Sequence, residues 1–105
     1  MVTVKPKTRV ELALKGVGET HARTRVTTRD VATIVDEPLA RGGSNEGPTP
    51  TETLMASLIA CTTVITQRIA ARDGVAVGSL EVDATAKLDR RGAALEQEIE
   101  KPFSD

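Results

Sequence analysis

The sequence predicts an α+β fold in which antiparallel strands wrap around a buried central helix. One long stretch in the middle of the chain has apolar residues at helical spacing. The segments before and after it alternate between apolar and polar residues, as strands do. The predicted order is three strands, one helix and two strands, so strands and helices are segregated along the chain. With 105 residues, 39% apolar and 28% charged, residues 1–105 have the composition of a single small globular domain.

Three strands are predicted before the helix, after a flexible arm at residues 1–7. Residues 9–15 alternate between apolar and polar side chains and predict a half-buried strand, followed by a turn at residues 16–19. Residues 21–28 (HARTRVTT) predict a second strand, which is unusually polar, and residues 31–36 predict a third. Three strands in succession indicate an antiparallel meander.

The central helix is predicted from about Pro50 to about Arg72. Thr49 can cap this helix, Pro50 suits its first position, and Glu52 stands where a capping box places its carboxylate. Asp73-Gly74 predict its end. One apolar stripe follows the helical spacing, made of Leu54, Leu58, Cys61, Ile65 and Ile69. Because the helix is apolar on most faces, the rest of the chain or a partner chain must cover it.

Two further strands are predicted after the helix, at residues 79–88 and 93–100, with a hairpin turn at residues 89–92. The sequence has one Phe and neither Trp nor Tyr, so small aliphatic side chains must build the core. A domain of this length buries only about two-thirds of its unfolded surface. We therefore expect a homodimer or a higher homo-oligomer to complete the core.

Composition argues against several classes of partner and cofactor. A net charge of −1 and the near absence of aromatic residues give no reason to expect nucleic acid. The apolar run at residues 54–65 is too short for a bilayer, so we expect no membrane partner. One Cys and one distant His form no metal-ligand set, and no glycine pattern matches a nucleotide loop, so no cofactor is expected. The absence of a signal peptide and the single cysteine indicate the cytoplasm.

Cys61 is the residue that could carry covalent chemistry. A buried thiol is most often an unreactive packing group. The functional alternative is a peroxidatic thiol, which needs an apolar surround and a nearby cation that favours the thiolate. The polar second strand supplies the candidate cations, whose alternative role is a solvated strand face: His21, Arg23, Arg25 and Arg29.

Glu52 also has two possible roles. As a capping-box residue it stabilises the start of the helix. As a catalytic residue it would hold an arginine over the thiol of Cys61, although it lies nine residues away, which is roughly 13 Å along the helix axis. That separation excludes direct contact between the two side chains, so a long arginine from another strand would have to bridge part of it.

Residues 36–66, DEPLARGGSNEGPTPTETLMASLIACTTVIT, resemble the OsmC/Ohr family of osmotically induced and organic-hydroperoxide-resistance proteins, in its OsmC-like branch. The shared features are Asp-Glu-Pro, the Gly-Gly loop, the Pro-x-Glu start of the helix and a cysteine deep within it. The resemblance implies an α+β fold in which two chains intertwine, with active sites at the dimer interface.

The resemblance also implies a thiol peroxidase of the oxidative-stress response. Cys61 would attack the O–O bond of an organic hydroperoxide and become a sulfenic acid, positioned by Glu52 and by Arg23, with Arg25 as the alternative. In the family a second cysteine on a later helix resolves the sulfenic acid. This chain has no such cysteine, as expected of a chain that ends where the second half of the family fold begins, so its cycle needs an external thiol reductant.

Two other functions remain open from the residues alone. The main alternative is a non-catalytic OsmC-like protein, or a binder of small apolar ligands, in which Cys61 only packs. A structural module for oligomerisation is a third alternative.

Overall fold

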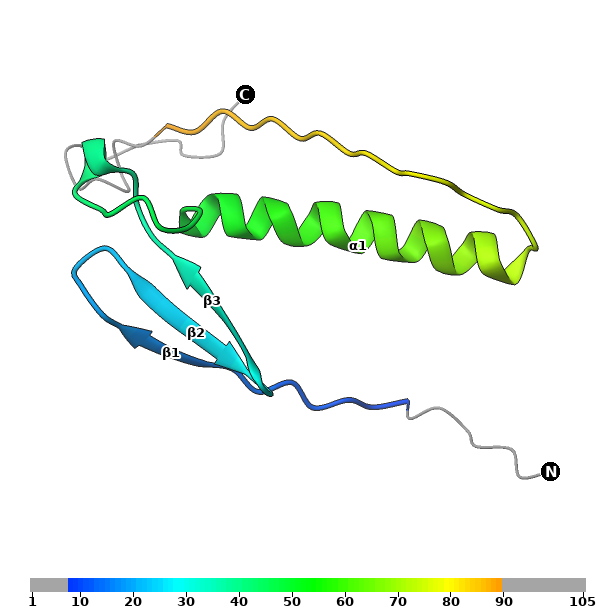
Figure 1. Cartoon of the computed structure of the whole chain (residues 1–105), viewed down its shortest axis with the longest axis horizontal. Coiled ribbons are helices and arrows are strands. Elements are labelled where there is room, and N and C mark those ends of the chain that lie inside the picture. The colour runs from blue at the N-terminus through cyan, green and yellow to red at the C-terminus, as the bar shows by residue number, and fades with distance from the viewer. Residues whose placement is uncertain (1–7, 90–105) are drawn as a thin grey trace.

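The computed structural model describes residues 8–89. The predicted arm at residues 1–7, the predicted strand at residues 93–100 and most of the turn before it lie outside the described residues. Figure 1 shows a small sheet and one long helix that are joined by a loop, with an extended segment running back along the helix. The elements in order are β1 (Lys15–Gly18), β2 (Thr24–Thr28), β3 (Val31–Val35), the short 3-10 helix η1 (Leu39–Arg41) and α1 (Pro50–Arg72).

The three strands form one antiparallel sheet in the order β1-β2-β3, which confirms the predicted meander. β2 and β3 lie within the predicted second and third strands. The turn between β1 and β2 is fixed by the Thr20 hydroxyl, which accepts hydrogen bonds from the amides of Ala22 at 3.1 Å and Arg23 at 2.9 Å. This local turn sets which residues of the two strands face each other.

The position of the first predicted strand is wrong. We expected a strand at residues 9–15 and a turn at residues 16–19, whereas β1 is Lys15–Gly18. Lys15 pairs with Thr27, and β2 ends one residue later at Thr28. Residues before the start of β1 therefore run past the end of β2. The alternating residues before Lys15 form no hydrogen-bonded ladder, because no neighbouring strand is there to pair with them.

The central helix is confirmed, since α1 spans Pro50–Arg72. Its start carries the predicted capping box between Thr49 and Glu52, and Pro50 occupies the first turn. Gly74, just past its end, has the left-handed φ of 70° that a glycine adopts without strain. The amide of Val75 donates to the carbonyl of Ala70 at 2.8 Å and closes the last turn. Both helix ends are thus determined by residues next to them in the sequence.

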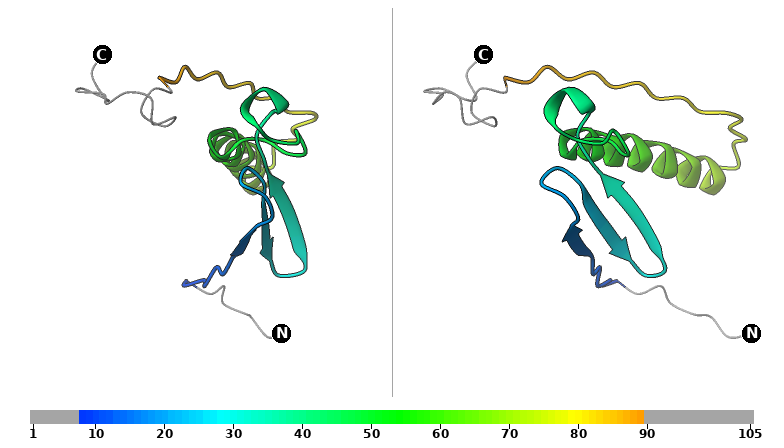
Figure 2. Two further views of the ribbon diagram at one scale, coloured as in Figure 1. Left: turned by 90° about the vertical axis from the view of Figure 1, so that its left-hand side faces the viewer. Right: turned by 60° about the vertical axis from the view of Figure 1, so that its left-hand side comes forward.

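Residues 8–89 do not bury α1, although the sequence predicts a buried helix. Ala70 is the one buried apolar side chain among the described residues. Leu54 and Leu58 are each 64% exposed, and Ile65 is 52% exposed. Figure 2 shows the sheet and α1 leaving the joining loop in different directions, so the sheet does not cover the helix. Residues 8–89 therefore leave this apolar face of α1 uncovered.

The predicted strand at residues 79–88 is also wrong within the described chain. Residues 75–89 are extended and run alongside α1, but they join no sheet. The predicted alternation of apolar and polar residues is present in the sequence. Its predicted partner, residues 93–100, lies outside the described residues, and the described strands β1, β2 and β3 pair only with one another.

By length and composition alone, α1 would be able to cross a membrane. The apolar run at residues 54–65 is too short for this, but the full helix of 23 residues is long enough. A single helix of this kind is weak support for a membrane protein, because the core helix of a soluble protein meets the same criteria.

Candidate functional site

The loop between β3 and α1 is organised around the carboxylate of Asp36, which is fully buried at 0% exposure. Its Oδ1 accepts a hydrogen bond from the amide of Glu37 at 2.8 Å. Its Oδ2 accepts hydrogen bonds from the amides of Ser44 at 3.2 Å and Glu46 at 3.1 Å. The amide of Asp36 donates to the carbonyl of Pro48 at 2.9 Å. These four bonds fold the loop back onto the end of β3.

Two glycines allow the loop to lie directly on the backbone of β3 and the residues that follow it. A Cβ atom on Gly43 would lie 1.9 Å from the carbonyl oxygen of Glu37. A Cβ atom on Gly47 would lie 2.2 Å from the carbonyl oxygen of Ile34. Neither distance is physically possible, so any larger residue would force the loop away. The close approach explains why glycines stand in this part of the Gly-Gly loop.

Arg23, the arginine predicted to serve the thiol, is engaged with two carboxylates. Its Nε donates to Glu19 at 3.1 Å, and its Nη1 donates to Glu46. The charge of Glu46 is the main reason that the pKa of Arg23 is raised above its ordinary value. Because Glu46 belongs to the loop and Arg23 to the turn before β2, this ion pair joins the sheet to the loop. Arg23 forms no ion pair with Glu52.

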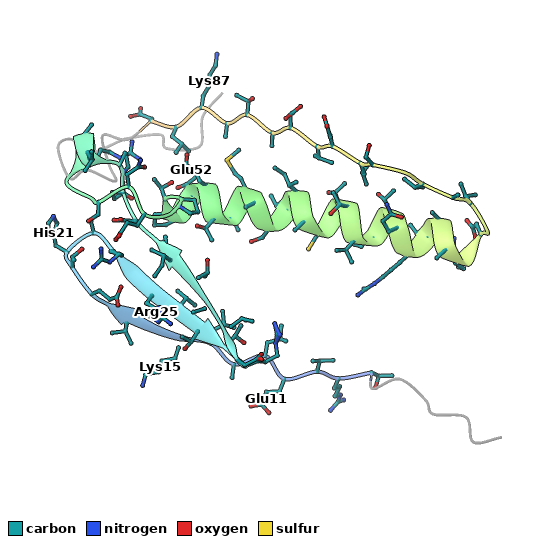
Figure 3. All side chains as sticks on the ribbon, in the orientation of Figure 1. Glu11, Lys15, His21, Arg25, Glu52 and Lys87 are labelled. Atoms are coloured by element: carbon teal, nitrogen blue, oxygen red, sulfur yellow. The ribbon has the colours of Figure 1, made fainter. Side chains whose placement is uncertain are left out.

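Arg25, the alternative, is exposed on β2, and its side chain makes no hydrogen bond or ion pair with any residue between positions 8 and 89. Its backbone lies opposite Val17 of β1 and Ile34 of β3. Figure 3 shows Arg25 on the sheet and Glu52 at the start of α1, on different elements. A guanidinium without a partner among residues 8–89 can pair with a carboxylate on another chain.

Glu52 acts as a helix cap in the single chain. Its Oε1 accepts from the amide of Thr49 at 2.8 Å, and its own amide donates to the Thr49 hydroxyl at 3.2 Å. These bonds from the Thr49 backbone and side chain hold the pKa of Glu52 below its ordinary value, and the charge of Arg41 adds to the effect. Arg41 itself pairs with Glu37 at 2.8 Å.

Cys61 lies exposed in the middle of α1, within the apolar stripe that begins at Leu54. Within residues 8–89 its thiol takes part in no hydrogen bond. Glu52 stands nine residues earlier, which places it roughly 13 Å away along the axis and on the opposite side of the helix. The structure therefore does not bring Cys61, Glu52 and Arg23 together within one chain.

The other two predicted cations lie at the ends of the sheet. His21 is at the tip of the β1–β2 turn, and its Nε2 lies 3.3 Å from where a Cβ on Gly42 would stand. Arg29 occupies the turn between β2 and β3, with a left-handed φ of 52°. In the part of the chain that the structure describes, no three or more His, Cys, Asp or Glu side chains are grouped so that they could hold a metal ion.

The sequence reasoning missed the role of Asp36 and Glu46. Asp36 was expected as the end of a strand and as part of the Asp-Glu-Pro feature of the resemblance, and no role was predicted for Glu46. A signal was present, because Asp36 is followed by Pro38, Gly42, Gly43 and Gly47 within twelve residues. An aspartate before such a loop often accepts hydrogen bonds from the loop's own amides.

Comparison with known proteins identifies one family. A family model described as OsmC-like protein matches residues 43–102, which is more than half of the chain. The match includes Gly43, the capped start of α1 and Cys61. Neither a curated protein nor a solved structure matches the chain.

Proposed function

The chain belongs to the OsmC-like protein family, and from this premise we propose that it is a thiol-dependent peroxidase of the oxidative-stress response. Its substrate would be an organic hydroperoxide and its nucleophile Cys61. The observation that carries the proposal is an accessible thiol in the middle of an exposed apolar stripe. An organic hydroperoxide has an apolar carbon group next to its O–O bond. Leu58 and Ile65, on either side of the thiol along the stripe, can bind that group.

The proposed reaction has two stages. The thiolate of Cys61 attacks the terminal oxygen of the hydroperoxide, so an S–O bond forms while the O–O bond breaks. The departing alkoxide takes a proton from solvent and leaves as an alcohol, and Cys61 becomes a sulfenic acid. An external thiol then forms a mixed disulfide with Cys61 and releases water. A second external thiol restores the Cys61 thiol and leaves as part of a disulfide.

The proposal includes a homodimer or higher homo-oligomer, because the single chain leaves the apolar stripe uncovered. A second copy would bury Leu54, Leu58 and Ile65 and exclude water around the thiol. It would also bring a cation to Cys61. Arg23 is the proposed cation and must then leave Glu46. Arg25, which has no ion pair with the described residues, is the alternative.

Glu52 of each copy is proposed to hold the arginine that its own chain supplies to the thiol of the other copy. A carboxylate whose pKa is held below its ordinary value is ionised at neutral pH and can pair with a guanidinium. We also propose that the protein acts in the cytoplasm, with α1 as the shared core helix of the oligomer rather than a membrane span.

The substitution Cys61→Ser tests the proposal. Consumption of cumene hydroperoxide in the presence of excess dithiothreitol should fall to the background rate, because serine cannot form a sulfenic acid. The matched control is Ser57→Ala, an exposed position one turn earlier on α1, which should keep the wild-type rate. Mass spectrometry of the wild-type protein after one equivalent of peroxide should find the added oxygen on Cys61. Unchanged consumption by Cys61→Ser would refute the peroxidase.

A second candidate function is a non-catalytic OsmC-like protein that binds small apolar ligands. The observation that favours it is the lack of any hydrogen-bonding partner for Cys61 among residues 8–89. In this case Cys61 would react with hydroperoxides no faster than a free thiol does. Cys61→Ser would then bind an apolar fluorescent dye as well as the wild-type protein, whereas Leu58→Asp would bind it poorly.

A further inference from the structure

We propose that Asp36 positions Glu46 and, through it, the guanidinium of Arg23. Through the amides of the loop it holds Glu46 against Arg23, and it thereby fixes the sheet relative to the start of α1. The proposal concerns the arrangement of the chain's own groups and can be tested without measuring peroxidase activity. Its relevance to catalysis rests on the proposed function, in which Arg23 serves the thiol.

The joint between the sheet and α1 is the first observation. Extensive contacts between the described elements are confined to the sheet itself, where β1 packs on β2 and β2 on β3. α1 has no such contact with any strand, as Figure 2 also shows. The orientation of the helix relative to the sheet therefore depends on the loop at residues 36–49.

The hydrogen bonds of Asp36 are the second observation. Its backbone amide donates to Pro48 at 2.9 Å, directly before the helix cap Thr49. Its carboxylate accepts from the amides of Ser44 and Glu46. Glu46 in turn accepts from the guanidinium of Arg23. A continuous series of contacts thus leads from Asp36 through Glu46 to Arg23, and a second one leads from Asp36 to the start of α1.

The ionised form of Asp36 is the form that this arrangement requires. Burial by itself raises the pKa of Asp36, but the amides of Glu46, Glu37 and Ser44 and the charge of Arg23 outweigh burial and lower the pKa. All three donors are N–H groups, so the site needs three accepting lone pairs. An asparagine would turn an N–H toward at least one of these donors and leave it unsatisfied. The charged groups around Asp36 are Arg23 from the turn before β2, and Glu37 and Glu46 from the loop.

The test compares Asp36→Asn with Glu46→Gln in the full chain by NMR. Asp36→Asn should speed hydrogen exchange at the amides of residues 44 and 46 by about tenfold or more, because the neutral asparagine oxygen accepts more weakly than a carboxylate and cannot accept from all three amides. It should also change the Nη1–H resonance of Arg23, because Nη1 is the group that donates to Glu46. Glu46→Gln should change the Arg23 resonance alone and leave both amides protected. The matched control is Asp30→Asn, an exposed aspartate in the β2–β3 turn, which should change neither readout.

Two outcomes would overturn the proposal. In the first, Asp36→Asn frees the amides but leaves the Arg23 resonance unchanged, which would make Asp36 only a local support of its own loop. In the second, the amides stay protected in Asp36→Asn. If this variant does not fold, the same two readouts, amide exchange and the Arg23 resonance, are measured on the wild-type protein in low concentrations of urea. There the amides of residues 44 and 46 and the Arg23 pair should open together, and separate openings would refute the coupling.

The same variants separate this inference from the proposed function. A wild-type protein that consumes no hydroperoxide would refute the peroxidase, while the NMR result on Asp36 would stand. If the peroxidase is real, Asp36→Asn and Glu46→Gln should alter its rate in the same direction, since both release Arg23 from Glu46 while its bond to Glu19 stays in place.

Discussion

Leu58 offers a direct measure of what the uncovered face of α1 contributes to self-association. The residue is 64% exposed in the single chain, so most of its side chain can still gain burial against a second copy. Full burial of a leucine contributes about 1.5–3 kcal/mol, so the remaining gain is roughly 1–2 kcal/mol per copy. A two-fold symmetric interface buries the residue twice. The substitution Leu58→Ala should therefore cost about 2–4 kcal/mol of dimer stability.

This cost can be expressed as a dissociation constant. Each factor of ten corresponds to about 1.4 kcal/mol, so the Kd of the Leu58→Ala dimer should rise between about 30-fold and about 700-fold. Sedimentation equilibrium over a range of protein concentrations measures this change. Alanine keeps the helix, because it has the highest helix propensity. Far-UV circular dichroism should therefore be the same for the variant and the wild-type protein at matched oligomeric state.

The control for Leu58→Ala is Leu39→Ala. Leu39 is 74% exposed but lies on η1, away from the apolar stripe of α1. It should leave the Kd unchanged. A Kd that is equally unchanged by Leu58→Ala, or equally raised by both substitutions, would refute the proposal that this helix face is the interface.

Two further predictions concern the loop and the start of α1. Thr49→Ala removes the hydroxyl that accepts from the Glu52 amide at 3.2 Å. It should cost about 1 kcal/mol and lower the Tm by about 4–8 °C, measured by thermal unfolding. The second prediction is acid sensitivity. Because the pKa values of Asp36 and Glu52 are lowered in the folded chain, both add stability above the ordinary carboxyl range. The free energy of unfolding, measured by urea denaturation, should therefore stay constant from neutral pH down to about pH 4. It should then fall as the pH passes through the lowered pKa values of the two carboxyl groups.

Each of these two predictions has its own control. Thr51→Ala alters an exposed threonine in the same helical turn and should leave the Tm within about 1–2 °C of the wild-type value. An equal loss for both threonines would show that capping is not the cause. For the acid prediction, stability that rises as pH falls below 4 would contradict the lowered pKa values.

The sequence predicts best what neighbouring residues determine. The bounds of α1 follow from a threonine, a proline and a glutamate at its start and from an Asp-Gly at its end, and all of them act within a few residues. The meander follows in the same way from short turns. Cys61 is found on the predicted apolar stripe for the same reason, since helical spacing alone places it there.

The sequence fails where structure depends on a distant partner. Residues 9–14 and 79–88 both alternate between apolar and polar side chains, yet neither forms a strand, because no strand among residues 8–89 lies beside it. The apolar face of α1 predicts burial but does not reveal what buries it. Asp36 was missed because its importance lies in three amides that only the folded loop brings to it, two of them eight and ten residues away.

The self-contained ends of α1 have a consequence for how this protein folds. A helix of 23 residues whose first and last turns are closed by neighbouring groups can form in microseconds, before slower long-range pairing is complete. The apolar face of α1 is then exposed to solvent early in folding, while the chain is still monomeric. Productive assembly must therefore compete with aggregation from the start, and refolding yield should fall as protein concentration rises.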